Sequence, residues 1–343
     1  MNGGKLLIVG NSSSVHTNNL KTLVGGYFGQ VKVADSKNFS VRMPLKFIKS
    51  FFTSCKELRA YAPSFIILYQ VDIAAFAVTV IKRFFVKSLR RCPVLVVGIG
   101  SDVLTVADKS ALNRRIARYV INHGDYFNAG SVAIKEKMQQ LASRPIKVLI
   151  ANLGTDDILP QTKQDIVFSN RLHKDFYNIR KIIDAFAVFV RQAEYEHWKL
   201  VIAATGMETE FLNQARELGI EDKVQCVGWL DKQQNNYWYS VSKIWVSLPD
   251  SDSVSISLLE AMSAECFPVC SDVPALKGFL TDNINAVIVR DFEENFFKRA
   301  VDLMNDGILN RNRQQARDFA DKEKNRQRFY SLFDEALKAE KQD

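Results

Sequence analysis

The chain has 343 residues, too many for one ordinary hydrophobic core, so we expect two domains. Its 47% hydrophobic and 24% charged residues are typical of a globular protein and exclude a disordered one. Residues 1–150 hold 22 Lys and Arg against 7 Asp and Glu, a net charge of +15, whereas residues 151–343 hold 24 against 31, a net of −7. The basic first half is therefore expected to face an anionic partner.

The cysteines and the first residues predict a cytoplasmic protein. The five cysteines are an odd number and widely spread, so we expect free thiols and neither disulfides nor a zinc site. Residues 1–5 lead directly into an apolar strand, without a signal peptide. Gln70 and Asp72 interrupt the apolar stretch 64–81, which favours a buried strand and helix over a membrane span.

The first half alternates strands with helices. Strands are predicted at residues 5–9, 31–35, 65–69, 93–98, 125–131 and 147–151. The first strand runs into a loop of small residues and a helix from about residue 18, which is typical of a nucleotide-binding α/β domain. Because G-x-G-x-x-G is absent, a dinucleotide site is not expected.

Two predicted helices of the first half mix basic and aromatic residues. One covers residues 42–61, and the other includes residues 82–91. Interleaved cations and apolar side chains suit an anionic bilayer surface, so peripheral membrane contact through 42–59 and 82–91 is expected. The alternative is a Phe stripe that faces the core, with a solvated basic back. No nucleic-acid-binding motif is present, so nucleic acid is not an expected partner.

The second half repeats the alternation after a turn-rich boundary at residues 152–165. The predicted domains are 1–155 and 156–320, followed by a C-terminal helix at 321–343. Strands are predicted at 166–170, 199–204, 243–248, 267–270 and near 289, a helix after Pro274, and a long charged helix at 317–341.

The stretch 248–289 carries the main functional signal. A polar loop precedes a helix predicted at 253–265, so Asp252 stands at the helix start and Glu260 two turns inside. A rise of ~1.5 Å per residue separates the carboxylates by roughly 12 Å, which is enough to span the two sugars of a nucleotide sugar. Its diphosphate would meet free N–H groups at the helix start. The alternative is an N-cap at Asp252 and a solvated Glu260.

This stretch resembles the donor-binding signature of retaining glycosyltransferases of family 4 (group 1), in which seven residues separate two acids. The resemblance runs from the string SSSVHT at 12–17 to the strand near 289 and is strongest at 166–275. It implies the GT-B fold, an α/β architecture of two Rossmann-like domains facing across a cleft. It also implies a hexosyltransferase that uses a UDP- or GDP-linked sugar as substrate and needs no metal or other cofactor.

The resemblance assigns roles to individual residues. Asp252 would hold hydroxyls of the donor sugar, Glu260 the ribose and Arg171 the diphosphate, a task that suits the fork of donors on Arg. Further donor-side candidates are Lys174, Gly206, Trp229, Leu230, Ser253, Val254 and Ser255. Acceptor-side candidates are Ser14, His16, Ser101 and Asp102, and the catalytic candidates are Asp102, Asp252 and Arg171. For Asp102 the alternative is a helix cap.

The basic first half and the family together imply a lipid-linked saccharide acceptor at the inner face of the plasma membrane, as in lipopolysaccharide and other surface polysaccharide synthesis. Phe176, Gly278 and Ala286 depart from the family pattern, whereas Asn283 can supply the positive φ of the Gly it replaces. Because of these departures, one alternative function is that of a non-catalytic protein that binds a sugar nucleotide. A nucleotide-sugar epimerase or phosphorylase on the same fold is the other alternative.

Overall fold

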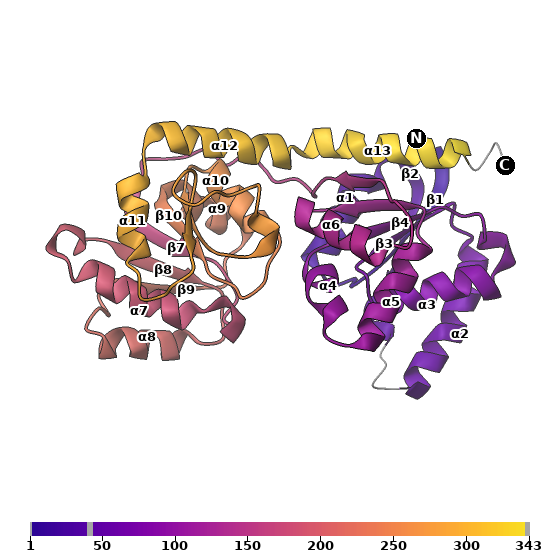
Figure 1. The fold of residues 1–343 in the computed structure, drawn as a ribbon, viewed down its shortest axis with the longest axis horizontal. Helices are drawn as coiled ribbons and strands as arrows, with labels where there is room; N and C mark the ends of the chain where they lie inside the picture. Colours follow the sequence, from indigo (N-terminus) through magenta and orange to yellow (C-terminus); the bar gives the residue numbers. More distant parts are fainter. Residues whose placement is uncertain (1, 40–43, 340–343) are drawn as a thin grey trace. The chain divides into compact units, whose positions relative to one another are not determined.

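The computed structural model describes residues 2–39 and 44–339. The chain forms two compact units: Met1–Gly154 with Lys322–Asp343 makes unit 1, and Thr155–Asp321 makes unit 2. Each unit is a six-stranded sheet with helices on both faces (Figure 1). The chain therefore leaves unit 1 once and returns to it for the last helix. The predicted boundary at 155 lies one residue from the first crossing.

Unit 1 contains a parallel sheet in the order β2-β1-β3-β4-β5-β6. Its strands are β1 (Asn2–Gly10), β2 (Phe28–Asp35), β3 (Phe65–Tyr69), β4 (Val94–Gly98), β5 (Tyr126–Ala129) and β6 (Val148–Ile150). Its helices are α1 (Val15–Gly25), α2 (Pro44–Tyr61), α3 (Ile73–Val80), α4 (Ser101–Leu104), α5 (Ala111–Asn122), α6 (Val132–Leu141) and α13 (Lys322–Ala339). Because side chains alternate along a strand, Leu7 packs with α2, α3, α5 and α6, while Leu6 packs with α1 and α13.

Aromatic rings hold α13 against unit 1. The Phe333 ring centroid lies 5.2, 5.1 and 5.0 Å from those of Tyr27, Phe28 and Phe65. The Tyr27 hydroxyl donates a hydrogen bond to the Asp334 carboxylate. Ring pairs at such separations add stability beyond their buried area. The last helix is therefore part of the core of unit 1.

Unit 2 contains a second parallel sheet in the order β12-β11-β10-β7-β8-β9. Its strands are β7 (Gln164–Ser169), β8 (Lys199–Ala203), β9 (Val224–Gly228), β10 (Ser242–Ser247), β11 (Phe267–Ser271) and β12 (Val287–Val289). The order reverses between β7 and β10, because the chain proceeds outward from β7 through β8 and from β10 through β11. In open parallel sheets, ligands bind at the carboxyl ends of the strands at such a switch point.

Helices cover both faces of the second sheet. They are α7 (Ile179–Val190), α8 (Glu208–Glu217), α9 (Lys232–Val241), α10 (Ile256–Ser263), α11 (Phe296–Leu303) and α12 (Asp306–Ala320). Val167 and Ile244 pack with α7, α8 and α11, whereas Phe168 and Trp245 pack with α9, α10 and α12. The switch point therefore has α7 on one face and α9 and α10 on the other.

A half-buried lysine, Lys163, fixes the ends of α9 and α10. The Lys163 ammonium donates to the carbonyl oxygens of Tyr239 at 3.0 Å, Ser242 at 2.9 Å and Ala264 at 2.5 Å. Burial lowers the pKa of Lys163. The carbonyls lie at the C-terminal ends of the two helices, where a cation is favoured by the helix dipole. Lys163 thereby anchors both helices that flank the switch point.

Three predicted helices differ from the structure. The helix through 82–91 is wrong, because α3 ends at Val80 and two short turns follow, Ile81–Phe85 and Lys87–Leu89, in which Val86 and Leu89 return to the core. Pro274 begins only a short 3-10 turn. The long C-terminal helix is interrupted at Asp321, where the N–H of Thr155 donates to the carbonyl of Ala320 at 2.9 Å.

Candidate functional site

Arg171 and Asp252, which are 81 positions apart, meet at the switch point of unit 2. Arg171 follows β7 and Asp252 follows β10, and Arg171 Nη2 lies 2.6 Å from Asp252 Oδ2. The guanidinium carbon lies 4.4 Å from the ring centroid of Tyr177. Arg171 Nε is buried and has no hydrogen-bond partner among the described residues. A buried guanidinium with an unused donor is a suitable site for an anion.

The loop between β10 and α10 is held by its own small side chains. Asp252 Oδ1 accepts a hydrogen bond from the N–H of Ser253 at 2.8 Å, and Ser255 caps α10 by accepting from the N–H three residues on. The helix therefore begins at Ile256 and not at 253 as predicted. Because residues 252–255 are not helical, the estimate of roughly 12 Å between the two carboxylates does not apply.

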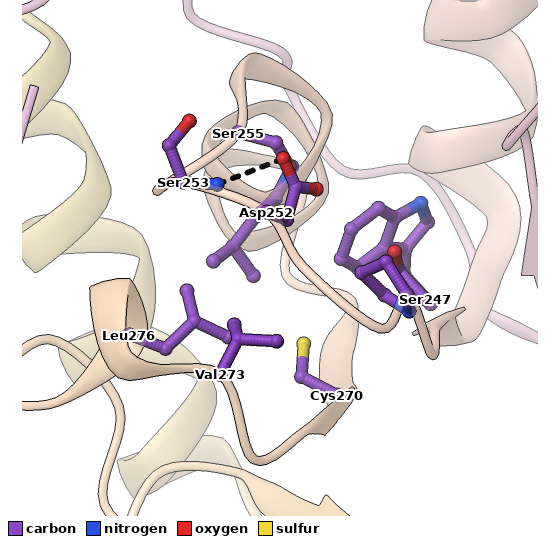
Figure 2. Close-up of a pocket in the computed structure, with 10 residues that line it drawn as sticks. Ser247, Asp252, Ser253, Ser255, Cys270, Val273 and Leu276 are labelled. Atoms are coloured by element: carbon purple, nitrogen blue, oxygen red, sulfur yellow. Dashed lines mark hydrogen bonds between the residues drawn. The ribbon is translucent and has the colours of Figure 1, made fainter. Parts of the chain in front are cut away.

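A small, shallow pocket lies beside this loop. It is lined by Trp245, Ser247, Pro249, Asp252, Ser253, Ser255, Leu258, Cys270, Val273 and Leu276. Figure 2 shows Asp252 and Ser253 on one side and Cys270, Val273 and Leu276 on the other. Burial raises the pKa of the Cys270 thiol well above its usual range, so the thiol stays protonated. A polar side opposite an apolar floor suits an oriented small polar ligand.

An amide network that the sequence did not reveal lies behind Arg171. The Asn170 side chain donates to the Tyr239 hydroxyl at 2.6 Å and to Asn235 Oδ1 at 3.0 Å, and it accepts from the Trp245 indole at 3.0 Å. Burial raises the pKa of Tyr239, and the Glu260 carboxylate on α10 raises it further. Asn170 thus joins β7, β10 and α9 directly next to Arg171, and half-buried Glu260 lies on the helix beside this network.

The loop after β8 is organised by His173, which the sequence analysis did not single out. Its Nδ1 accepts from the N–H of Met207 at 3.1 Å, so Nε2 carries the proton and donates to the carbonyl of Ala203 at 3.0 Å. Gly206 has a φ of +127°, and its N–H donates to Glu208 at 2.7 Å. That N–H is therefore already engaged with a carboxylate, which an incoming phosphate would have to displace.

The remaining donor-side candidates differ in the exposure of their side chains. Lys174 is exposed just after β7, and Trp229 is 68% exposed directly after β9. Leu230 and Val254 pack into the core formed with α9 and α10. Their side chains are therefore committed to the core, and only their backbone groups are available to a ligand.

Asp102 has a structural task, and the structure does not support contact between its carboxylate and a reacting centre. It is buried and accepts hydrogen bonds from the N–H groups of Val71 at 2.9 Å, Gly100 at 2.8 Å and Ile99 at 3.2 Å. These donors lie after β3 and β4, so the carboxylate joins two loops. Ser101 is exposed in the same loop.

The titration of the Asp72 carboxyl predicts that the stability of unit 1 depends on pH. It caps α3 by accepting from the N–H groups of Ala74 and Ala75, both at 2.9 Å. Burial, assisted by the Asp102 carboxylate, raises the pKa of Asp72 from its usual value near 3.8 to about 6. Between these values the folded state binds the proton and the unfolded state does not, so stability falls as pH rises from about 4 to about 6.

Asp72→Asn keeps an N-capping oxygen but removes the titration. Relative to wild type, the variant should gain roughly 1–3 kcal/mol of unfolding free energy between pH 4 and pH 7. Urea unfolding of both proteins at pH 4, 5, 6 and 7 measures this difference. Parallel pH profiles for the two proteins would show that Asp72 does not titrate in this range.

The acceptor-side candidates of unit 1 lie at the start of α1. Ser14 occupies the N-cap position, and His16 is exposed in the first turn. The preceding loop is tied to the end of β2, because Ser12 donates to Asp35 and Lys37 donates to Ser13 at 3.1 Å. The acceptor-side roles of Ser14 and His16 stay predictions.

Within the described residues, no three His, Cys, Asp or Glu side chains are grouped so that they could hold a metal ion. In the same part of the chain, no helix combines the length and hydropathy needed to cross a membrane. All five cysteines are free thiols, as expected.

A family model described as "Glycosyl transferases group 1" matches residues 156–325. This range includes Arg171, the loop around Asp252 and all of α10. Residues 156–325 form a group 1 glycosyl transferase domain. The resemblance that the sequence analysis drew from the spacing of Asp252 and Glu260 is thereby confirmed at the level of the family.

One relative is the GDP-mannose:cellobiosyl-diphosphopolyprenol alpha-mannosyltransferase of Xanthomonas campestris. It is 30% identical over 95 residues, which are 27% of this glycosyltransferase and 25% of the relative. The match therefore spans about a quarter of the length of the relative.

Solved structures resemble the whole chain. HepE of Anabaena in complex with UDP-glucose has a TM-score of 0.74 at 15% identity, over 97% of this chain and 100% of HepE. Sucrose-phosphate synthase of Thermosynechococcus elongatus has a TM-score of 0.77 at 12% identity, over 98% and 100% of the two chains. At these identities the likeness shows the fold, and it confirms the predicted α/β GT-B fold of two Rossmann-like domains.

Proposed function

We propose that this glycosyltransferase moves a sugar from a UDP- or GDP-linked donor to a lipid-linked saccharide, with the anomeric configuration retained. The observation that carries the donor half is the partly buried contact of 2.6 Å between Arg171 and Asp252 at the switch point, next to the start of α10. An arginine with an unused Nε and a helix N-terminus together provide donors and positive charge for a diphosphate.

In this proposal the bond between the anomeric carbon and the diphosphate oxygen breaks, and the acceptor hydroxyl attacks from the same face. The acceptor proton passes to the departing phosphate oxygen. Arg171 and the N–H groups at the start of α10 stabilise the charge on the leaving diphosphate, a contribution of typically about 3 kcal/mol for each well-placed donor. Asp252 accepts hydrogen bonds from the donor sugar, and Glu260 accepts them from the ribose.

The names of similar proteins support the two substrate classes. The Xanthomonas relative is named for a GDP-mannose donor and a diphosphopolyprenol-linked acceptor, and HepE was solved with UDP-glucose. Because the two donors carry different bases, both UDP- and GDP-linked sugars stay in the proposal. A role in surface polysaccharide synthesis follows from a lipid-linked acceptor.

A thermal-shift panel with UDP, GDP and their sugars tests the donor half. A ligand present at a hundred times its Kd should stabilise the folded state by about 2.7 kcal/mol, which raises the unfolding temperature by several degrees. UMP and GMP, which lack the second phosphate, are the matched controls and should give much smaller shifts. If neither nucleotide series shifts the unfolding temperature, the donor proposal fails.

For the acceptor half, we propose that unit 1 contacts an anionic membrane surface on its cytoplasmic face. The exposed apolar residues of α2 and of the turn Ile81–Phe85 after α3 are Leu45, Ile48, Phe52, Phe84 and Phe85, and we call them the apolar patch. Exposed basic residues on the same segments are Lys46, Lys49, Lys56, Arg59, Arg83, Lys87, Arg90 and Arg91. Arg42 of the predicted segment lies outside the described residues.

The structure joins the two basic segments into one surface. The ring centroids of Phe51 and Phe85 are 5.1 Å apart, and Arg59 donates to the carbonyl of Phe85 at 3.1 Å. Phe47 and Phe51 pack against the core, so the alternative of a core-facing Phe stripe holds for them but not for Phe52 and Phe84. Apolar side chains ringed by cations suit the headgroup boundary of an anionic bilayer.

A triple variant, Leu45→Ser, Ile48→Ser and Phe52→Ser, tests the membrane proposal. Removing three apolar side chains from the interface should lower binding to phosphatidylglycerol vesicles by roughly 10- to 100-fold. Vesicle co-sedimentation measures this change. The control is Leu159→Ser with Val188→Ser, two exposed apolar residues of unit 2. Equal binding of the triple variant and wild type would contradict the proposal.

A further inference from the structure

Two side chains of the proposed donor site pair with each other. Asp252 and Arg171 pair at 2.6 Å with side chains only 22% and 9% exposed. A carboxylate and a phosphate present similar pairs of oxygens to a guanidinium, so Asp252 lies where an anionic ligand of Arg171 would bind. The two partners are on separate loops, after β10 and β7, and can part without moving the sheet.

The carboxylate and a diphosphate compete for the charge and the donors of one arginine. Two anionic groups at the same guanidinium repel each other, and in a partly buried site this repulsion is weakly screened. If the Asp252 carboxylate moves away from Arg171, its Oδ2 loses a charged donor. Only the hydrogen bond from the N–H of Ser253 to Oδ1 then remains. A carboxylate displaced in this way needs new donors, because an unpaired buried charge is costly. Hydroxyl groups of a sugar are donors of the right kind.

We propose that Asp252 is a specificity-determining residue that competes with the diphosphate for Arg171. The Asp252 carboxylate releases the guanidinium of Arg171 fully only when hydroxyls of the donor sugar bind to the carboxylate. This inference rests on the proposed function of the same site. Its consequence is that the free nucleoside diphosphate, which has no sugar, binds more weakly than the intact donor. The same competition helps the product to leave after transfer.

The test is isothermal titration of wild type and Asp252→Asn with pyrophosphate, UDP, GDP, UDP-glucose, UDP-N-acetylglucosamine and GDP-mannose. In the variant, the affinity for pyrophosphate and for the preferred nucleoside diphosphate should rise about tenfold, because the competing charge is gone. The affinity for the sugar-linked donor should fall, so that the preference for donor over diphosphate disappears.

Asp250→Asn is the matched control, because it removes a charge from the same loop while Asp250 bonds to Asn178 and not to Arg171. It should leave all affinities within about twofold of wild type. Asp252→Ala repeats the test without an amide at this position. If both Asp252 variants bind the diphosphate and the donor more weakly by the same factor, Asp252 merely orients Arg171 and the inference is overturned. If wild type binds no nucleotide at all, the proposed function itself fails.

Discussion

Replacing Arg171 with alanine is expected to lower kcat for sugar transfer by about a thousandfold. Arg171 is the buried cation at the switch point, and the leaving diphosphate gains a further negative charge as its bond to the sugar breaks, so kcat should fall in addition to the affinity for the donor. Arg171→Lys keeps the charge but not the fork of donors, and it should recover only part of the activity. Steady-state kinetics with the donor identified by the nucleotide panel provide the measurement.

Two controls keep this result interpretable. Arg216→Ala removes an exposed arginine of α8 that hydrogen bonds to Asn213, and it should behave like wild type. Circular dichroism and thermal unfolding of Arg171→Ala check that unit 2 remains folded, because the change leaves Asp252 without its partner. A folded Arg171→Ala variant with activity near that of wild type would remove Arg171 from the site.

Glu260→Ala is expected to abolish transfer and donor hydrolysis, with a loss of at least about a hundredfold in kcat/KM, while the protein stays folded. Two charge-assisted hydrogen bonds to a ribose contribute roughly 1.5–3 kcal/mol each. Glu217→Ala, at an exposed position of α8, is the matched control and should retain full activity.

A donor with 2′-deoxyribose shows whether Glu260 acts on the ribose. Wild type should lose affinity for this donor, whereas Glu260→Ala should discriminate little between the ribose and deoxyribose forms, because the partner of the hydroxyl is already missing. If the losses caused by Glu260→Ala and by the 2′-deoxyribose donor are additive, Glu260 does not contact the ribose hydroxyl. Wild-type turnover by Glu260→Ala would show that Glu260 is not part of the site.

The alternation of strands and helices could be predicted because apolar runs that end at polar loops are a local signal. Residues 65–69 form β3 as predicted, and Asn283 has the positive φ of 59° that was expected where the family has glycine. Arg171 and Asp252 were predicted from the family resemblance, and the sheet order explains why they meet. The order of strands around β7 and β10 is a tertiary property that no single stretch encodes.

Other features depended on contacts distant in the sequence. Asp252, Ser253 and Ser255 are all good N-cap residues, so local preference could not choose among them. Arg171 engages Asp252 from 81 positions away, and the cap is then formed by Ser255. Asp102 was assigned to the reacting centre by resemblance, but its carboxylate binds the N–H of Val71, 31 positions away. His173 gave no signal, because its role depends on the loop after β8.

The most direct test of the donor site is a crystal structure of the wild-type protein with UDP or GDP bound. We expect phosphate oxygens of the ligand at hydrogen-bond distance, roughly 2.7–3.0 Å, from the guanidinium of Arg171, at the switch point between β7 and β10. A diphosphate bound elsewhere on unit 2, with Arg171 still paired to Asp252, would contradict the account.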